Sequence, residues 1–226
     1  MFRVKKQFDG LGNIFIHLSQ LPNEFPVSKK SLTAGYRGKY LEFTNLHLVE
    51  DDDIVPSTET PPIYINPYTS QYIHPLCRTK VKPSSILLEH LSKYPSSFPV
   101  GIAIRLGKMH KDDYQNVADE HALKVFNSII EKEQGPIFLA TDSLEYKKEL
   151  DTKFPGKLFF IDRPLVVVNS DNIVDDPLPF LEFFLLSKCN QLYITGGNKD
   201  FSCFSTYGYM ASIYGSKPFT VVWNDK

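Results

Sequence analysis

Apolar strand-like runs alternate with helix-like segments throughout residues 96–226, and this alternation constrains the fold more than any other feature of the chain. Each run is short and rich in β-branched or aromatic residues, and enough chain for a helix separates it from the next. The runs are FPVGIAIRL (98–106), PIFLAT (136–141), KLFFID (157–162), QLYIT (191–195) and PFTVVW (218–223). Such alternation predicts a parallel sheet covered by helices on both faces. Ligands bind beyond the carboxyl ends of the strands in such sheets, so we expect the functional residues there.

Four helices are expected between these strands. The longest runs roughly from Asp113 to Glu133, because apolar residues recur along one of its faces. The others are expected over 143–154, 177–188 and 202–213. The segment PLPFLEFFLLSK (177–188) is apolar on nearly all sides, which predicts a buried helix.

Residues 1–95 form a second region with weaker periodicity. A strand is expected from Phe2 to Phe8, followed by the glycine-containing loop DGLGN and a short helix. Short strands are expected over the runs YLEFTNLHL (40–48) and IYIN (63–66). The stretch YPSSFP (94–99) is typical of a linker, so the sequence predicts two domains, 1–95 and 96–226.

The charge of the chain excludes several classes of partner. Its 226 residues contain 25 basic and 26 acidic side chains, so no net field attracts nucleic acid or a membrane surface. No segment resembles a signal peptide or reaches the length of a membrane span, which predicts a cytoplasmic protein without membrane insertion. The three cysteines lack metal-ligand spacing and are expected to be reduced thiols. The histidines also show no ligand spacing, so no metal site is expected.

Polar residues follow three of the predicted strands. Arg105 ends the first strand, where a guanidinium could hold a diphosphate through paired hydrogen bonds or could pair with a nearby carboxylate. Asp142 follows the second strand and precedes Glu145 by three residues, the pattern of a helix capping box. Ser202 and Ser205 follow the fourth strand and a Thr-Gly-Gly turn, at a helix start suited to binding an anion or to simple capping.

The order of these features resembles the fucosyltransferase superfamily of GT-B fold, which includes nodulation α-1,6-fucosyltransferases and protein O-fucosyltransferases. Family members carry a GLGN-type loop, an arginine-bearing strand end, an ATD strand end, a D-x-x-x-L-S helix and an SxFS loop. The matching segments here are GLGN (10–13), IRL (104–106), ATD (140–142), EFFLLS (182–187) and SCFS (202–205). The resemblance implies an α/β, GT-B-like architecture of two Rossmann-like lobes. The N-terminal lobe is reduced and lies on the acceptor side, and the C-terminal lobe binds a nucleotide sugar on its parallel sheet.

The resemblance also implies roles for individual residues. Arg105 would hold the donor diphosphate and assist departure of the nucleotide, together with hydroxyl and N–H groups of residues 202–206. Two carboxylates would face the nucleotide base, and the glycine-containing loop would close over the donor from the opposite lobe. The residues implied to contact the donor are Gly10, Gly12, Asn13, Arg105, Asp142, Glu182, Ser202, Phe204, Ser205 and Thr206.

The implied reaction is the inverting, metal-independent transfer of a 6-deoxy-hexose, L-fucose from GDP-fucose, to a hydroxyl of a carbohydrate or glycoprotein acceptor. No cofactor is expected, because the nucleotide sugar is the donor substrate. An inverting transferase needs a base for the acceptor hydroxyl, and Asp113 lies where some relatives have an acidic catalytic residue. His110, Asp112 and Asp9 compete for that role, and Asp113 is equally suited to beginning the long helix.

Three alternatives remain open from the sequence. Ala103, Leu106 and Lys108 stand where the family has histidine, a second arginine and often an acidic residue, and Glu182 replaces the family aspartate. Another nucleotide sugar, such as UDP-L-rhamnose, is therefore an alternative donor. A non-catalytic module that binds a nucleotide sugar is the second alternative. The third is a metal-dependent GT-A enzyme, because Asp51 and Asp53 form a D-x-D pattern that holds a divalent metal in that class.

Overall fold

The structure is a computed structural model that describes residues 15, 18–19, 26–29, 37–49, 77–107, 117–164, 175–197 and 204–225. The predicted strand at Phe2 to Phe8, the loop DGLGN and the predicted strand 63–66 lie outside these residues. Among the described residues, no helix combines the length and the apolar character that a membrane span requires.

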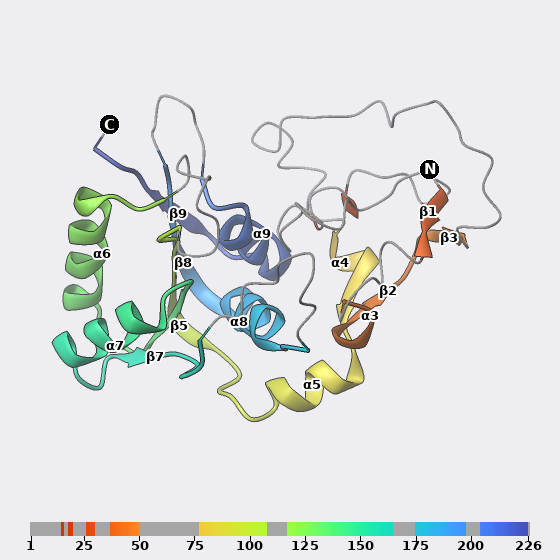
Figure 1. The fold of residues 1–226 in the computed structure, drawn as a ribbon, viewed down its shortest axis with the longest axis horizontal. Coiled ribbons are helices and arrows are strands. Elements are labelled where there is room, and N and C mark those ends of the chain that lie inside the picture. The colour runs from red at the N-terminus through yellow and green to blue at the C-terminus, as the bar shows by residue number, and fades with distance from the viewer. Residues whose placement is uncertain are drawn as a thin grey trace.

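A five-stranded parallel sheet forms the centre of the molecule and confirms the predicted sheet (Figure 1). Its strands are β5 (Phe98–Ile104), β6 (Ile137–Thr141), β7 (Leu158–Phe159), β8 (Cys189–Thr195) and β9 (Phe219–Val222). Their spatial order is β7-β6-β5-β8-β9, so the chain moves outward from β5 in one direction and then returns to build the other half. The direction reverses between β5 and β8, which makes their carboxyl ends the topological switch point of the sheet.

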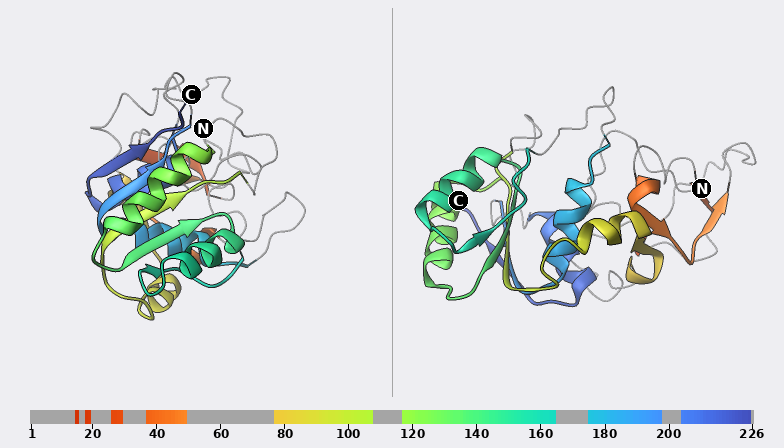
Figure 2. Two further views of the ribbon diagram at one scale, coloured as in Figure 1. Left: turned by 90° about the vertical axis from the view of Figure 1, so that its left-hand side faces the viewer. Right: turned by 90° about the horizontal axis from the view of Figure 1, so that it is seen from below.

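Helices cover both faces of the sheet, as the alternation predicts. The helices α6 (Glu120–Lys132) and α7 (Leu144–Lys153) lie on one face, and α8 (Leu178–Ser187) and α9 (Thr206–Gly215) lie on the other (Figures 1 and 2). The face under α6 buries Ile102, Phe126 and Ile130 in one apolar cluster. The opposite face buries a larger cluster around α8, which explains why nearly every residue of α8 is buried.

The N-terminal elements lie on the outer side of α8 and α9 (Figures 1 and 2). They are β1 (Pro26–Ser28), α3 (Arg37–Tyr40), β2 (Leu41–Phe43), β3 (His47–Val49), α4 (Cys77–Lys80), β4 (Val81–Pro83) and α5 (Ser85–Leu91). β1 pairs in parallel with β3, and β2 pairs antiparallel with β4. One apolar cluster runs from these elements into α8 and α9, so residues before and after position 95 contribute to the same core.

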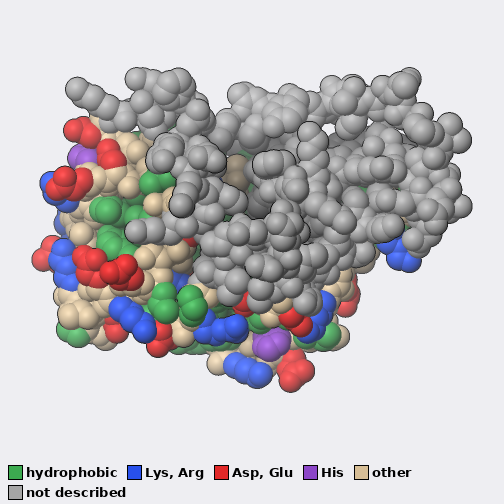
Figure 3. All heavy atoms as spheres, in the orientation of Figure 1, with side chains coloured by type: hydrophobic (Ala, Val, Ile, Leu, Met, Phe, Trp, Pro, Cys, Tyr) green, Lys and Arg blue, Asp and Glu red, His purple; other side chains and the backbone are tan. Residues whose placement is uncertain are grey.

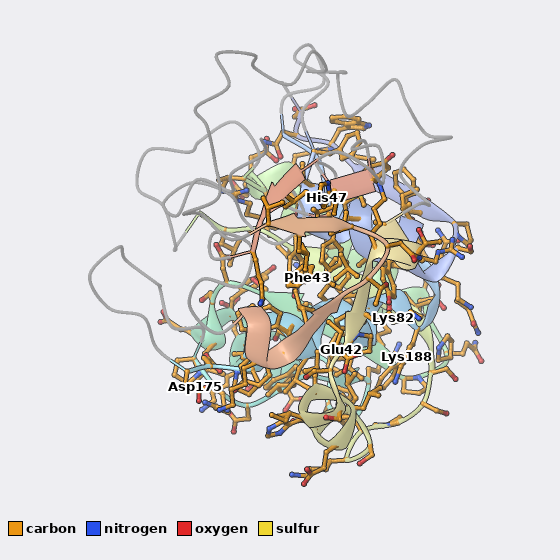
Figure 4. The ribbon with its side chains drawn as sticks, turned by 90° about the vertical axis from the view of Figure 1, so that its right-hand side faces the viewer. Glu42, Phe43, His47, Lys82, Asp175 and Lys188 are labelled. Carbon is orange, nitrogen blue, oxygen red and sulfur yellow. The ribbon has the colours of Figure 1, made fainter. Side chains whose placement is uncertain are left out.

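Polar contacts reinforce this packing. Arg78 donates from Nη2 to the carbonyl of Ile213 at 2.8 Å, near the end of α9, and the Tyr214 hydroxyl donates to the carbonyl of Val81 at 3.1 Å. Lys39 and Tyr40 both donate to the carboxylate of Asp175, which precedes α8. Figure 4 shows this face, with Asp175 beside α3 and with Glu42 and Lys82 at opposite register positions of β2 and β4. Two regions of the sequence are therefore joined by polar as well as apolar contacts.

The surface over α6 and α7 carries interspersed acidic and basic side chains (Figure 3). Lys124 and Glu120 form one such exposed pair at 3.1 Å along α6. Pairs of this kind contribute little to stability, so these helices are held mainly by their buried faces.

Three sequence predictions are wrong in their boundaries. The long helix begins at Glu120 with Asp119 as its N-cap, and residues 117–119 are not helical, so it does not extend back to Asp113. The predicted strand 157–162 is reduced to the two residues of β7. The run 40–48 is divided by a turn at residues 45–46 into β2 and β3, and Asn45 in that turn adopts a positive φ of 53°.

The free thiols of Cys77 and Cys189, both buried, agree with the predicted reduced state.

Gly208 allows α9 to approach the sheet closely. A Cβ atom at this position would lie 2.6 Å from Cγ2 of Ile194 and 3.2 Å from Cβ of Ala103. Both neighbours belong to strands at the switch point, so the absence of a side chain brings the start of α9 directly onto β5 and β8. The helix start is thereby fixed beside the strand ends.

We predict that Gly208→Ala destabilises the protein. Replacing glycine by alanine inside a helix normally gains about 1 kcal/mol. Here the added methyl group overpacks the sheet, at a cost of about 1–3 kcal/mol, so we expect a net loss in the free energy of unfolding. Urea denaturation measures this difference. An increase in stability equal to the normal helix-propensity gain would contradict the close packing of α9.

Candidate functional site at the carboxyl ends of β5 and β8

The two central strands are tied together at their carboxyl ends by Thr195, the last residue of β8. Its hydroxyl accepts a hydrogen bond from the backbone N–H of Arg105 at 3.0 Å and donates to the carbonyl of Ala103 at 3.1 Å. The side chain is fully buried. Thr195 therefore fixes the backbone of Arg105 at the switch point, where α/β sheets bind ligands.

Arg105 lies at the start of the connection that leads from β5 to α6. Its carbonyl accepts a hydrogen bond from the N–H of Ala118 at 2.8 Å, so the two ends of this connection meet. Its side chain is half-buried beside the strand ends. These hydrogen bonds anchor the backbone of Arg105, and its guanidinium is a group suited to pairing with a carboxylate or a phosphate.

Asp142 follows β6 and binds the backbone just beyond the neighbouring strand, β5. Its Oδ1 atom accepts a hydrogen bond from the backbone N–H of Leu106 at 2.8 Å. The predicted capping box is wrong, because Ser143 rather than Asp142 is the N-cap of α7 and accepts from the N–H of Tyr146 at 3.2 Å. The one-residue difference frees the Asp142 carboxylate to hold the chain beyond Arg105.

The start of α9 closes against the end of β8. Phe204 forms an antiparallel bridge with Gly196, and the N–H of Ser205 donates to the carbonyl of Thr195 at 2.8 Å. Ser205 is the N-cap of α9, and Thr206 is its first residue. The aromatic ring of Phe204 packs edge-on against Tyr209, with ring centroids 5.3 Å apart. The positive end of the α9 dipole and the Arg105 backbone thus lie at the same edge of the sheet.

Glu182 is buried in α8 and paired with Lys147 of α7. Lys147 Nζ lies 2.5 Å from Glu182 Oε1, and only 3% of Glu182 and 1% of Lys147 is exposed. Burial raises the pKa of Glu182 to about 7, against the opposing attraction of Lys147. The two helices lie on opposite faces of the sheet, so the pair links the two helical layers.

Ala103, at the position where the resemblance would imply a histidine, is buried beneath α9. Its Cβ is one of the atoms that a side chain at Gly208 would meet. An imidazole at this position would need the space that α9 occupies. Leu106, in place of the second arginine, packs at the edge of the apolar cluster under α6. Both replacements are therefore integrated into the packing of this chain.

The structure brings together five of the predicted site residues, describes a sixth, Glu182, within the buried helix α8, and does not describe the other five. Arg105, Asp142, Phe204, Ser205 and Thr206 lie at the carboxyl ends of β5, β6 and β8 or at the start of α9. Glu182 lies in the buried ion pair with Lys147. Gly10, Gly12, Asn13, Asp113 and Ser202 lie outside the described residues, as do the competing bases His110, Asp112 and Asp9, and Asp51 and Asp53 of the D-x-D pattern.

Three further residues of this region carried no recognisable sequence signal. Thr195 ends an apolar run and precedes two glycines. This pattern predicts the end of a strand, but it does not predict the hydrogen bonds of the Thr195 hydroxyl to the neighbouring strand. Lys147 occupies an ordinary position in a polar helix, and Asn224 follows the last strand.

Within the described part of the chain, no group of three or more His, Cys, Asp or Glu side chains is arranged to hold a metal ion.

Comparison with solved structures identifies the class of fold. The chain has a GT-B-like, fucosyltransferase-like fold. It is similar to a NodZ α-1,6-fucosyltransferase soaked with GDP-fucose, with a TM-score of 0.58 and 12% identity over 91% of this chain and 89% of that chain. It is also similar to a NodZ α-1,6-fucosyltransferase co-crystallised with GDP, with a TM-score of 0.56 and 11% identity over 89% and 88% of the two chains.

Sequence comparisons give no match. No protein-family model and no curated protein matches the chain.

A third solved structure, of POFUT1 with GDP, aligns at a TM-score of 0.41 and 12% identity over 66% of this chain and 49% of that chain. The similarity to the NodZ structures therefore concerns the fold.

We predict that the buried ion pair is essential for stability. Lys147→Met leaves the Glu182 carboxyl group buried without its counter-charge, and we expect a loss of about 3–5 kcal/mol in the free energy of unfolding. The double variant Lys147→Met/Glu182→Leu replaces the pair by apolar side chains and should recover most of this loss. Urea denaturation of the three proteins measures both effects. Nearly equal stability of the wild type and Lys147→Met would contradict the pair.

Proposed function

We propose that the protein is an inverting, metal-independent glycosyltransferase that moves a 6-deoxy-hexose from a nucleotide sugar to a hydroxyl group of a glycan. The observation that carries this proposal is the meeting of Arg105 and the start of α9 at the switch point of the sheet. Both groups stabilise negative charge, and both are held by backbone hydrogen bonds to Thr195. The fold similarity to the NodZ fucosyltransferases supports the same conclusion.

The proposed chemistry needs stabilisation of a departing diphosphate. The Arg105 guanidinium can bind two phosphate oxygens, while the N–H groups and hydroxyls at the start of α9 bind others. Ser205 and Thr206 are the described hydroxyl residues at this helix start. Because the N–H groups at the start of α9 are fixed before the reaction, they would stabilise the leaving group without a reorganisation cost. In this proposal Asp113 takes the proton from the acceptor hydroxyl.

The proposal divides the chain by role. Residues 96–226 bind the donor, because the switch point lies within them, and residues 1–95 form the acceptor side. Gly10, Gly12 and Asn13 would contact the donor from that side, and Ser202 would bind the phosphates beside Phe204 and Ser205. An acceptor bound there would be a carbohydrate or a glycoprotein.

GDP-fucose is the donor we propose. The support is the fold similarity to NodZ structures that were soaked with GDP-fucose or co-crystallised with GDP. UDP-L-rhamnose or another nucleotide sugar is the alternative, favoured by the replacement of the family aspartate by Glu182. That carboxylate already has Lys147 as a partner, so its contact with a base would have to coexist with the ion pair.

A non-catalytic module that binds a nucleotide sugar is the second candidate function. The observation in its favour is the burial of Ala103 beneath α9, which leaves no imidazole beside Arg105 on that strand. The GT-A alternative has less support. Among the described residues, the strands before Asp51 have only three residues each and form two-stranded pairings rather than a nucleotide-binding sheet.

The proposal predicts that the protein binds a nucleoside diphosphate through Arg105. Calorimetric titration of the wild type with GDP, UDP and dTDP should show the tightest binding for GDP. Arg105→Ala removes charge-assisted hydrogen bonds worth about 1.5–3 kcal/mol, so its affinity should fall about tenfold to a hundredfold. Donor turnover by this variant should be lost while its thermal stability remains close to that of the wild type.

Two comparisons make this test decisive. Lys124→Ala removes an exposed cation from α6, on a different part of the surface, and should bind and turn over the donor normally. The double variant Lys147→Met/Glu182→Leu, if folded, reports whether Glu182 contributes to base recognition. Failure of all three nucleotides to bind the wild type would refute the proposal. Binding without donor hydrolysis or transfer would identify the non-catalytic module.

A further inference from the structure

The side chain of Asn224, two residues beyond β9, bridges the backbone of the connection between β5 and α6. Its Nδ2 atom donates to the carbonyl of Val117 at 2.8 Å, and its Oδ1 atom accepts from the N–H of Asp119 at 3.0 Å. One carboxamide thus satisfies an acceptor and a donor two residues apart, as a neighbouring strand would. The half-buried side chain extends the sheet contacts to residues 117–119, which lie outside the strands.

The backbone of the same residue binds the other central connection. The N–H of Asn224 donates to the carbonyl of Gly197 at 3.2 Å, just beyond the end of β8. The next N–H, that of Asp225, donates to Oδ2 of Asp119 at 3.2 Å. Asn224 therefore joins the chain leaving β8 to the chain entering α6.

These contacts lead directly to the elements at the switch point. Ala118, between the two residues that Asn224 binds, donates its N–H to the carbonyl of Arg105 at 2.8 Å. Gly197 follows Gly196, which bridges Phe204 at the start of α9. The Oδ1 atom of Asp119 also caps α6 through the N–H of Ala122 at 2.8 Å. A displacement of Asn224 would act on the Arg105 backbone and on the β8–α9 connection together.

We propose that Asn224 is a positioning residue that sets the separation between Arg105 and the start of α9. This role rests on the proposed function, because it matters when both elements bind one diphosphate. The carboxamide is required rather than a carboxylate of the same shape, since only the amide both donates and accepts. Asn224 touches neither the donor nor the acceptor in this proposal.

Asn224→Asp tests the role with an isosteric change. The carboxylate cannot donate to Val117, and its charge faces a carbonyl oxygen, so the backbone at 117–119 should loosen. Hydrogen–deuterium exchange should become faster at the amides of residues 118–119, with exchange in β6 unchanged. At saturating donor, kcat should fall about tenfold to a hundredfold, because small misplacements of binding groups have effects of this size. A global loss of stability would instead raise exchange throughout the sheet.

Two further variants complete the experiment. Asn190→Asp makes the same change at an exposed position at the opposite end of β8 and should leave exchange and kcat unchanged. Asn224→Gln keeps both hydrogen-bonding groups on a longer side chain, so it should remain folded and should lower kcat less than Asn224→Asp. It also provides the kcat comparison if Asn224→Asp does not fold.

The outcomes separate this inference from the proposed function. Normal kcat in Asn224→Asp with faster exchange at residues 118–119 would overturn the positioning role while leaving the transferase proposal intact. Unchanged exchange at these amides would also overturn it. If the wild type binds no nucleotide, the transferase proposal fails and the positioning role for a diphosphate fails with it, whereas the exchange data still establish whether Asn224 holds the two connections.

Discussion

The buried hydroxyl of Thr195 joins the two strands on which the rest of the structure depends. β5 and β8 are parallel neighbours in space but are separated in the chain by two strands and three helices. The side of the sheet to which the chain adds successive strands changes between them. The threonine hydroxyl accepts from Arg105 and donates to Ala103, so it satisfies backbone groups that the parallel ladder leaves open at its end. This places the candidate anion-binding groups at the position where the topology opens a crevice.

The packing beneath that edge follows from a small residue. Gly208 brings α9 against Ile194 and Ala103, and the helix start is then held by the N–H of Ser205 and by the bridge between Phe204 and Gly196. The same close approach explains why residue 103 is alanine in this chain.

The sequence was sufficient to predict the sheet, because each strand is a compact apolar run and the helices between them are long enough for crossovers. It also predicted which strand ends carry the polar groups, with Arg105 and Asp142 as examples. It failed at boundaries set by single hydrogen bonds: Ser143 rather than Asp142 caps α7, and Asp119 rather than Asp113 precedes α6. The partner of Glu182 and the contacts of Asn224 were not predictable, because they depend on tertiary contacts between residues 35 or more positions apart.

The central claim is that a nucleoside diphosphate binds at the carboxyl ends of β5 and β8. Titration of the isotopically labelled protein with GDP, followed through its backbone amide resonances, tests this most directly. We expect the largest saturable shifts at residues 104–107, 195–197 and 204–206, with smaller changes at 117–119. Saturable shifts confined to the opposite end of the sheet, or to the exposed faces of α6 and α7, would contradict it, as would the absence of any saturable shift.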